Sequence, residues 1–243
     1  MKKLITILFV LAYLSGFGQH AMFYKGDEVA LDFPKYRSSA SNHVTEAVPN
    51  KSVVVAAPSG VLTDDILFGV VIQDGSDGFT TPEGWTKIYL YQYHSDLSWA
   101  LYYKRATNDG AANNSATFRS YTVNTGKVLS AKILAYEGAK EIGTPYNLLN
   151  DELFIGGEYS IAPWLTTQYP ENLVVIFAMV SPGQLVNYNT TDFKQGGTII
   201  TSNINTSLTI YNESAVPAIS PLAGINWATS GAGTSYILEL LKQ

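Results

Sequence analysis

The sequence predicts an all-β protein, an antiparallel β-sandwich of the jelly-roll kind that could be pseudo-duplicated. Short β-rich runs recur between turn residues, and no long segment after residue 20 has helical periodicity. Apolar residues make up 46% of the chain, which is enough for a folded core, and charged residues make up only 14%. So little charge also argues against a disordered chain.

Residues 1–19 have the layout of a secretory signal peptide. Lys2 and Lys3 form a basic start, residues 4–14 are apolar except for one threonine, and small residues follow before Gln19. The apolar run is about half of the roughly 20 residues that a helix needs to cross a bilayer, so a permanent anchor is the weaker interpretation. A buried N-terminal strand is the alternative. We expect cleavage near the end of this segment.

The remaining chain divides into an arm and a sandwich. Residues 20–50 are poor in strand signals and predict an extended N-terminal arm or a strap on the body. Residues 51–243 are the predicted sandwich domain, with halves at about 51–138 and 170–243. We expect strands at 52–57, 66–73, 85–93, 97–105, 116–123, 128–136, 173–180, 198–201, 207–212, 224–229 and 235–241.

Two runs that overlap these segments, 65–72 and 172–179, are apolar on both faces and predict central strands. The run 97–105 alternates, so that Trp99 falls on an apolar face and Tyr102 on the opposite face. We expect Trp99, together with Trp85, to lie in the core.

A weak internal repeat relates the two halves. The run that begins at Asp65 is matched by the run that begins at Asn172, and the later β-rich runs of each half follow in the same order. Such halves could pack as one pseudo-symmetric sandwich or as tandem sandwiches. We favour one sandwich, because each half has only about five or six predicted strands.

Turn and core motifs of the first half carry a family resemblance. They are Pro58-Ser-Gly-Val61, Asp65-Ile-Leu-Phe68, Pro82-Glu-Gly-Trp-Thr86, Leu101-Tyr-Tyr-Lys104 and Ala135-Tyr-Glu-Gly138. This run resembles a β-sandwich module found in bacteriophage tail-fibre and other virion proteins and in bacterial secreted proteins. Asp64 stands where that pattern has glycine. Since turns and core positions carry the resemblance, it implies a fold and not an activity.

Composition excludes several functions. The net charge is −5, and after Lys140 the only basic residues are Lys194 and Lys242, against eight acids, so nucleic acid is not an expected partner. The chain has no cysteine, which excludes thiol catalysis and cysteine metal sites. None of its three histidines forms a pair with metal-ligand spacing. We therefore expect no metal and no cofactor.

The sequence offers no catalytic constellation, and we expect no enzyme. A Gly-x-Ser-x-Gly elbow does not occur. Asp64 and Asp65 are adjacent, so on a strand they point to opposite faces and cannot act as a glycosidase pair. Asp65 is interpreted as a turn-to-strand residue. The loop 74–78 is rich in oxygen ligands, but it lacks the pattern of a known calcium loop and is interpreted as a hairpin loop.

Tyrosines are the candidate ligand-binding residues. Tyr89, Tyr91 and Tyr93 are spaced by two, which places their rings on one strand face, and Tyr102 is the fourth member of the predicted stripe. Tyrosine offers a flat ring together with a hydrogen-bonding tip. Packing between strands is the competing explanation, since strands favour aromatic residues without any ligand.

These observations predict an exported, non-enzymatic β-sandwich protein, secreted or at the cell surface, that acts in adhesion, in glycan or partner binding, or in surface assembly. Its expected partners are a glycan or a protein surface, a homo-oligomer is possible, and it meets a membrane only through the uncleaved signal. A phage virion component, fibre or capsid-associated, is the alternative. A glycoside hydrolase is a third, weaker interpretation, because it needs two carboxylates that face each other across a groove.

Overall fold

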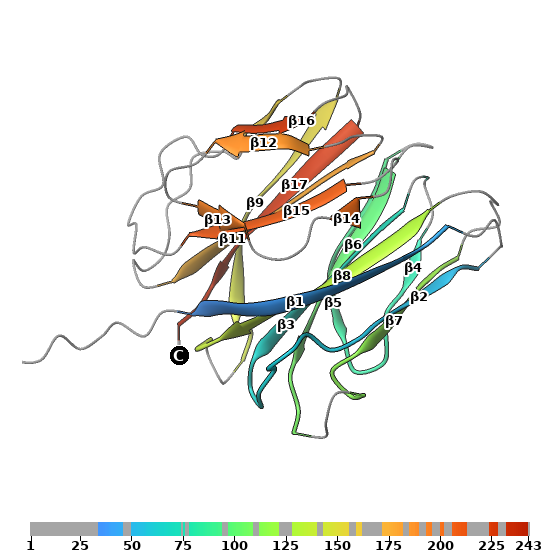
Figure 1. Ribbon diagram of the computed structural model, residues 1–243. Coiled ribbons are helices and arrows are strands. Elements are labelled where there is room, and N and C mark those ends of the chain that lie inside the picture. Colours follow the sequence, from blue (N-terminus) through green and yellow to red (C-terminus); the bar gives the residue numbers. More distant parts are fainter. Residues whose placement is uncertain are drawn as a thin grey trace, which may run out of the picture. The chain divides into compact units, whose positions relative to one another are not determined.

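Strands and turns make up the described residues, and none of these residues is helical (Figure 1). The computed structural model describes residues 34–45, 50–73, 75, 78–93, 97–108, 112–121, 128–139, 143–155, 159–161, 172–181, 185–189, 193–195, 200–201, 206–212, 224–227 and 232–242. All strand pairs in these ranges are antiparallel. The predicted antiparallel all-β fold is confirmed.

The first half forms a large and a small sheet. The first large sheet has the strand order β1-β8-β3-β6-β5, and the first small sheet has the order β2-β7-β4. The strands are β1 (Lys35–Val44), β2 (Ser52–Val55), β3 (Ile66–Gln73), β4 (Phe79–Thr80), β5 (Thr86–Tyr93), β6 (Leu97–Arg105), β7 (Ala116–Ser120) and β8 (Leu129–Glu137).

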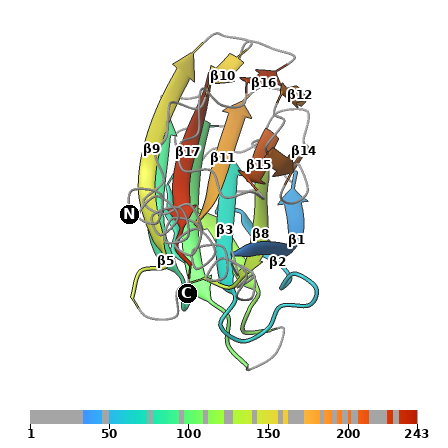
Figure 2. The ribbon, with the colours of Figure 1, turned by 90° about the vertical axis from the view of Figure 1, so that its left-hand side faces the viewer.

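The second half also forms a large and a small sheet. The second large sheet has the order β9-β17-β11-β15-β13, with β14 also paired to β15, and the second small sheet has the order β10-β16-β12. Figure 2 shows β9, β17, β11 and β15 side by side. The strands are β9 (Tyr146–Ile155), β10 (Tyr159–Ile161), β11 (Leu173–Ser181), β12 (Leu185–Asn189), β13 (Phe193–Gln195), β14 (Ile200–Thr201), β15 (Thr206–Asn212), β16 (Gly224–Trp227) and β17 (Ala232–Leu240).

Both halves wind in the same way. In the first half β1 pairs with β8, β2 with β7 and β3 with β6; in the second half β9 pairs with β17, β10 with β16 and β11 with β15. Pairing the first strand with the last, the second with the last but one, and so on inward is the winding of a jelly roll. The remaining strands correspond as well, β4 and β5 to β12 and β13. The predicted duplication is therefore present as topology.

A hydrophobic core fills the first half, between its large and small sheets. We call these two sheets together the first sandwich. Strands β2 and β7 contribute alternate residues, which is the pattern of a sheet with one buried face. The core residues are Val53, Val55, Leu67, Val71, Phe79, Trp85, Ala100, Tyr102, Ala106, Ala116, Phe118, Leu129, Ala131, Ile133 and Ala135.

A second core joins the two large sheets, and we call it the inter-half core. Phe68 of β3 lies edge-on to Phe177 of β11, with ring centroids 5.7 Å apart, and Trp99 of β6 lies edge-on to Tyr236 of β17 at 6.1 Å. Its buried residues are Ile66, Phe68, Val70, Ile72, Leu97, Trp99, Leu101, Leu134, Tyr136, Ala139, Leu173, Val175, Phe177, Met179, Tyr236, Leu238 and Leu240.

This arrangement corrects the expectation of one sandwich built from both halves. Each half forms its own sheets, and residues 33–243 nevertheless make one compact unit, because the large sheets bury a common core. In the described residues the only backbone pairing between the halves is a single bridge from Ala139 to Lys242. The first large sheet is therefore buried on both faces, and every residue of β3 is buried.

Two further boundaries are corrected. The predicted arm 20–50 contains β1, an edge strand paired with β8, and the predicted gap between the halves contains β9 and β10. The long strands β1 and β9 carry mixed polar and apolar residues. Their conformation is determined by backbone hydrogen bonds to their long neighbours, β8 and β17 respectively. The second half therefore begins at β9 instead of near residue 170.

Polar groups tie the first strand of each half to the start of its central strand. Arg37 of β1 contacts the Asp65 carboxylate at 2.7 Å and the Glu137 carboxylate at 2.5 Å. In the second half, the Asn172 amide donates to Glu239 at 2.9 Å, and Asn147 of β9 donates to the same carboxylate at 3.5 Å. Asp65 also accepts from the backbone N–H of Leu62, so its interpretation as a turn-to-strand residue is confirmed.

Asp64, which stands where the resembled pattern has glycine, adopts a glycine-like backbone conformation in the turn before β3. Its φ is +70°, in the left-handed region that glycine adopts without strain and that aspartate tolerates better than most residues. The backbone N–H of Asp64 donates to the Ala106 carbonyl at 3.1 Å, and the Arg105 guanidinium donates to the Asp64 carbonyl at 3.1 Å. These two hydrogen bonds hold the turn in this conformation.

Replacing Gly69 with alanine is expected to destabilise the first sandwich by about 1 to 3 kcal/mol, the usual cost of overpacking. A Cβ atom at Gly69 of β3 would lie 2.9 Å from the Phe118 ring and 3.0 Å from the Trp85 ring. Urea unfolding measures the change. The double variant Gly69→Ala/Phe118→Leu should show non-additive free energies, because the smaller side chain leaves room for the new methyl group. Additive effects would contradict this explanation.

Candidate functional site

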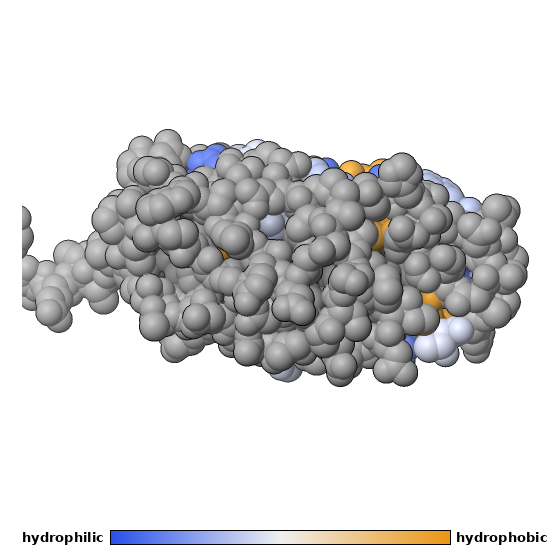
Figure 3. All heavy atoms as spheres, turned by 90° about the horizontal axis from the view of Figure 1, so that it is seen from above, coloured by the Kyte–Doolittle hydropathy of each residue, from blue (hydrophilic) through white to orange (hydrophobic). Residues whose placement is uncertain are grey.

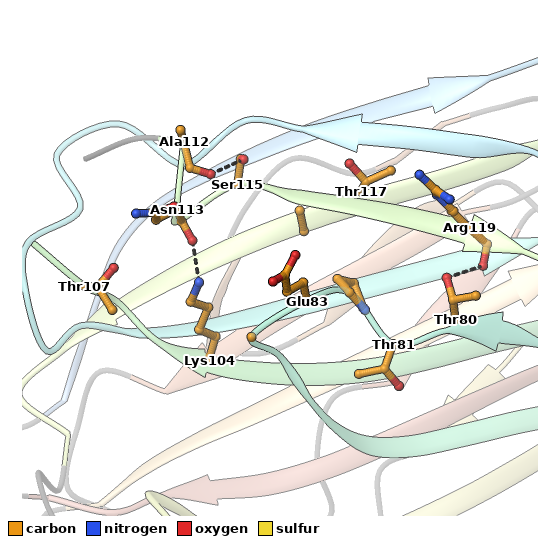
Figure 4. Close-up of a pocket in the computed structure, with 13 residues that line it drawn as sticks. Thr80, Thr81, Glu83, Lys104, Thr107, Ala112, Asn113, Ser115, Thr117 and Arg119 are labelled. Carbon is orange, nitrogen blue, oxygen red and sulfur yellow. Dashed lines mark hydrogen bonds between the residues drawn. The ribbon is translucent and has the colours of Figure 1, made fainter. Parts of the chain in front are cut away.

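An open polar groove of about 780 Å³ lies over the first small sheet and the connections beside it (Figure 4). Its size is in the range of small-molecule and ligand sites. Hydroxyl, amide and charged side chains dominate its lining. The lining residues are Thr80, Thr81, Pro82, Glu83, Gly84, Lys104, Thr107, Ala112, Asn113, Ser115, Ala116, Thr117 and Arg119.

The jelly-roll winding leaves this side of the small sheet open. In a complete winding β5 would pair with β4, but here β5 pairs with β6 in the large sheet. The small sheet therefore ends at the two-residue strand β4, and the chain crosses to the large sheet through the turn at 82–85. That turn is closed by a hydrogen bond from the Trp85 N–H to the Pro82 carbonyl at 3.1 Å. Gly84 has φ +74°, which this turn requires.

Because side chains alternate along a strand, every second residue of β7 points into the groove. Phe118 of β7 is buried in the first-sandwich core, so Thr117 and Arg119 on either side of it point outward. Figure 4 shows Thr117 and Arg119 side by side on this strand, with Thr80 of β4 next to Arg119. The Thr80 hydroxyl donates to the Arg119 carbonyl at 3.5 Å.

Three of the described side chains that line the groove are charged, and they offer both hydrogen-bond acceptors and donors. The Lys104 ammonium donates to the Asn113 carbonyl, which ties β6 to the connection before β7. In Figure 4 Glu83 lies between Lys104 and Arg119. Glu83 and Arg119 are exposed and form no ion pair with one another or with any other described residue.

A smaller recess of about 380 Å³ adjoins the groove at Thr107, which lines both. The connection between β2 and β3 forms its other wall, and none of the described residues that line it is charged. Asn114 is buried and fixes the shared wall, because its amide donates to the Thr107 carbonyl at 3.0 Å and its oxygen accepts from the Thr107 N–H at 3.1 Å.

The structure corrects the predicted tyrosine stripe. Tyr102 is fully buried in the first-sandwich core, where its hydroxyl donates to the Thr80 carbonyl at 3.3 Å. Burial, and then the neighbouring Tyr121, raise the pKa of the Tyr102 phenol above its ordinary value. The expectation of an exposed face failed because the small sheet of the same half covers this side of β6.

Tyr89 and Tyr91 do share one face of β5, as the spacing predicts, but that face meets the inter-half core. The Tyr89 ring lies 5.1 Å from the Trp99 ring and 4.6 Å from the Tyr236 ring, measured between centroids. The side chain of Tyr93 lies outside the described part. Replacing these tyrosines would therefore disturb packing, and they are not an exposed binding face.

The structure also places some of the other residues discussed from the sequence, among them one histidine and the two tryptophans. His43 is exposed on β1, whereas His20, His94 and most of the loop 74–78 lie outside the described residues. Within the described residues no cluster of three or more histidine, cysteine, aspartate or glutamate side chains is placed to hold a metal. Trp85 and Trp99 are buried, as predicted.

Exposed apolar side chains are scattered in the described part of the chain. The large ones are Val54, Leu62, Leu90 and Tyr121. In the view from above, apolar atoms of described residues appear as small separate spots (Figure 3). Single exposed apolar residues are normal on a folded protein.

The fold and groove define a tandem jelly-roll protein with a polar, solvent-open groove on its first sandwich. Comparisons with models of protein families, with curated proteins and with solved structures found no match to this chain. A search of the described residues found no helix that is both long and apolar enough to span a membrane.

The sequence contains a signal for the groove in Pro82-Glu-Gly84. This segment is a turn, and its central residue is one of few charged groups in a threonine-rich neighbourhood. The alternation in β7 also places Arg119 outward. The groove forms only because the 82–84 turn and the outer face of β7 lie close together in the fold. This closeness depends on β5 joining the large sheet.

Proposed function

We propose that the protein is an exported, non-enzymatic binding protein whose first sandwich recognises a glycan in the polar groove. The observation that carries this proposal is the combination of an exposed carboxylate, Glu83, and an exposed guanidinium, Arg119, in an open groove lined with hydroxyl and amide groups. Sugar hydroxyls both donate and accept hydrogen bonds, so they need acceptors and donors together. Hydrogen bonds to charged groups are the stronger ones.

Binding fits the groove better than catalysis does. Among the described residues that line it, Glu83 is the one carboxylate, whereas glycoside hydrolysis needs two carboxyl groups about 5 to 9 Å apart. The groove is also open to solvent, which suits the reversible capture of a surface ligand. Jelly rolls serve as lectin domains and as capsid domains, so the fold itself is compatible with either the glycan-binding or the virion interpretation.

Glycan arrays of immobilised oligosaccharides test this function. Glu83→Gln should weaken binding about tenfold or more, because hydrogen bonds to charged groups contribute about 1.5 to 3 kcal/mol. Thr117→Ala, inside the groove, should weaken binding by a smaller factor. Thr86→Ala removes the same hydroxyl at an exposed position of β5 outside the groove and is the matched control. Unchanged binding by Glu83→Gln would contradict the proposal.

Export is part of the proposal, and it is supported by the signal-like residues 1–19, which lie outside the described residues. The intact mass of the native protein tests it. A mass lower by that of the signal segment supports a processed, secreted chain. Retention of the segment would favour the virion interpretation, which the resemblance to tail-fibre modules supports.

A further inference from the structure

We infer that the ligand of the groove is an oligosaccharide, whose chain continues past Thr107 into the neighbouring recess. This inference rests on the proposed function and names its ligand class more closely. Thr107 is the shared boundary, since it lines the groove on one side and the recess on the other. An extended ligand is the kind that occupies two adjoining hollows at once.

The boundary between the two hollows is fixed. Asn114 holds both backbone groups of Thr107, at 3.0 and 3.1 Å, and is itself buried. On the recess side, the Ala106 N–H donates to the Asp65 carbonyl at 2.8 Å, which ties the β2–β3 connection to the end of β6. A binding surface that is already ordered loses less conformational entropy when a ligand binds.

The two hollows differ in chemistry, as two subsites for successive sugars would. The groove presents Glu83, Lys104 and Arg119, whereas the recess presents neutral groups such as the amide of Asn108 and the apolar surface of Val61. The first sugar would form charge-assisted hydrogen bonds in the groove. The next would add neutral hydrogen bonds and apolar contact in the recess, so each part of the chain contributes separately to affinity.

The test is a length series measured by titration calorimetry on the full mature chain. The probes are homo-oligosaccharides of glucose, N-acetylglucosamine and galacturonic acid with one to six residues. For the series that binds, affinity should rise about tenfold or more from the monosaccharide to the short oligosaccharides, because a second subsite that adds about 1.4 kcal/mol corresponds to a factor of ten. Affinity should then level off once both hollows are filled.

Thr63→Trp separates the two hollows. Thr63 is exposed and lines the recess but not the groove, so the indole should fill the recess, leave monosaccharide binding unchanged and remove the rise with length. Thr86→Trp makes the same substitution at an exposed site outside both hollows and should keep the rise. Thermal unfolding of both variants verifies that they are folded.

The outcomes distinguish the two proposals. A rise with length that Thr63→Trp removes and Thr86→Trp retains supports the oligosaccharide inference. Equal affinity at every length, with binding still lost in Glu83→Gln, overturns the inference and leaves glycan binding in place. Failure of every series, together with a blank glycan array, overturns the proposed function and the inference with it.

Discussion

Trp99→Ala is expected to lower the free energy of unfolding by about 3 to 5 kcal/mol, the usual loss when a large buried aromatic side chain is deleted. Trp99 of β6 is fully buried in the inter-half core. Its ring lies 5.1 Å from Tyr89 of the same sheet and 6.1 Å from Tyr236 of the second large sheet. Since the neighbours belong to both halves, the cavity weakens the contact between them as well as the sheet itself.

Guanidinium unfolding, followed by circular dichroism, measures this loss. Trp99→Phe should cost less than the alanine variant, because a ring remains between Tyr89 and Tyr236. Tyr121→Ala is the matched aromatic deletion at a site that is 60% exposed, and it should change the free energy by no more than about 0.5 kcal/mol. If Trp99→Ala unfolded with the same free energy as the Tyr121 variant, the inter-half core would not contribute to stability as described.

The sequence predicted best the strands whose own residues determine their environment. Residues 66–73 and 97–105 were predicted with the bounds of β3 and β6, because runs that are apolar on both faces, or apolar with aromatic residues, have few alternatives to a strand. Asp65 and Asn172 also occupy matching places, as predicted, since each directly precedes the central strand of its half.

The sequence-based predictions were wrong where the structure of a segment depends on residues far away in the chain. β1 is largely polar, and it is a strand because β8 supplies its hydrogen-bond partners about a hundred residues later in the chain. Tyr89 and Tyr91 share a face, as predicted, but whether that face meets solvent or protein depends on β17, near the C-terminus. No local pattern contains this information. The spacing of the tyrosines therefore predicts that they share a strand face, but it does not predict whether that face is buried.

The candidate groove depends on the same kind of long-range information. Its residues come from the β4–β5 turn, the β6–β7 connection and the outer face of β7. Each of these is visible in the sequence as a turn or an alternation. Their convergence follows from β5 leaving the small sheet, which neither the composition nor the spacing of residues indicates.

Lys132 is a charged residue inside the duplicated scaffold. It lies on β8 directly opposite Val70 of β3, so it faces the inter-half core, and it is fully buried. In the second half, the residue at the same place in the register is Tyr236, opposite Phe177. One half thus places an aromatic side chain where the other places an ammonium group.

Burial lowers the pKa of Lys132 from 10.5 to about 7, since desolvation disfavours the charged form. Between these two values the unfolded chain binds a proton that the folded chain does not, so the free energy of unfolding rises with pH across this window. From pH 7 to pH 9.5 the rise from this one group is on the order of 3 kcal/mol, because each pKa unit corresponds to about 1.4 kcal/mol. Below pH 7 the contribution of Lys132 to the free energy of unfolding becomes nearly independent of pH.

Lys132→Met is therefore expected to remove most of this rise and to stabilise the protein at pH 7, because the methionine side chain is buried without the desolvation cost that lowers the pKa of Lys132. Urea unfolding at pH 7.0, 8.0, 9.0 and 9.5 measures both effects. Lys35→Met removes the same charge from an exposed position of β1, and its curve serves as the reference for the loss of a lysine as such. Parallel curves for the wild type and Lys132→Met would show that the ammonium stays charged and solvated in the folded protein, against its place in the inter-half core.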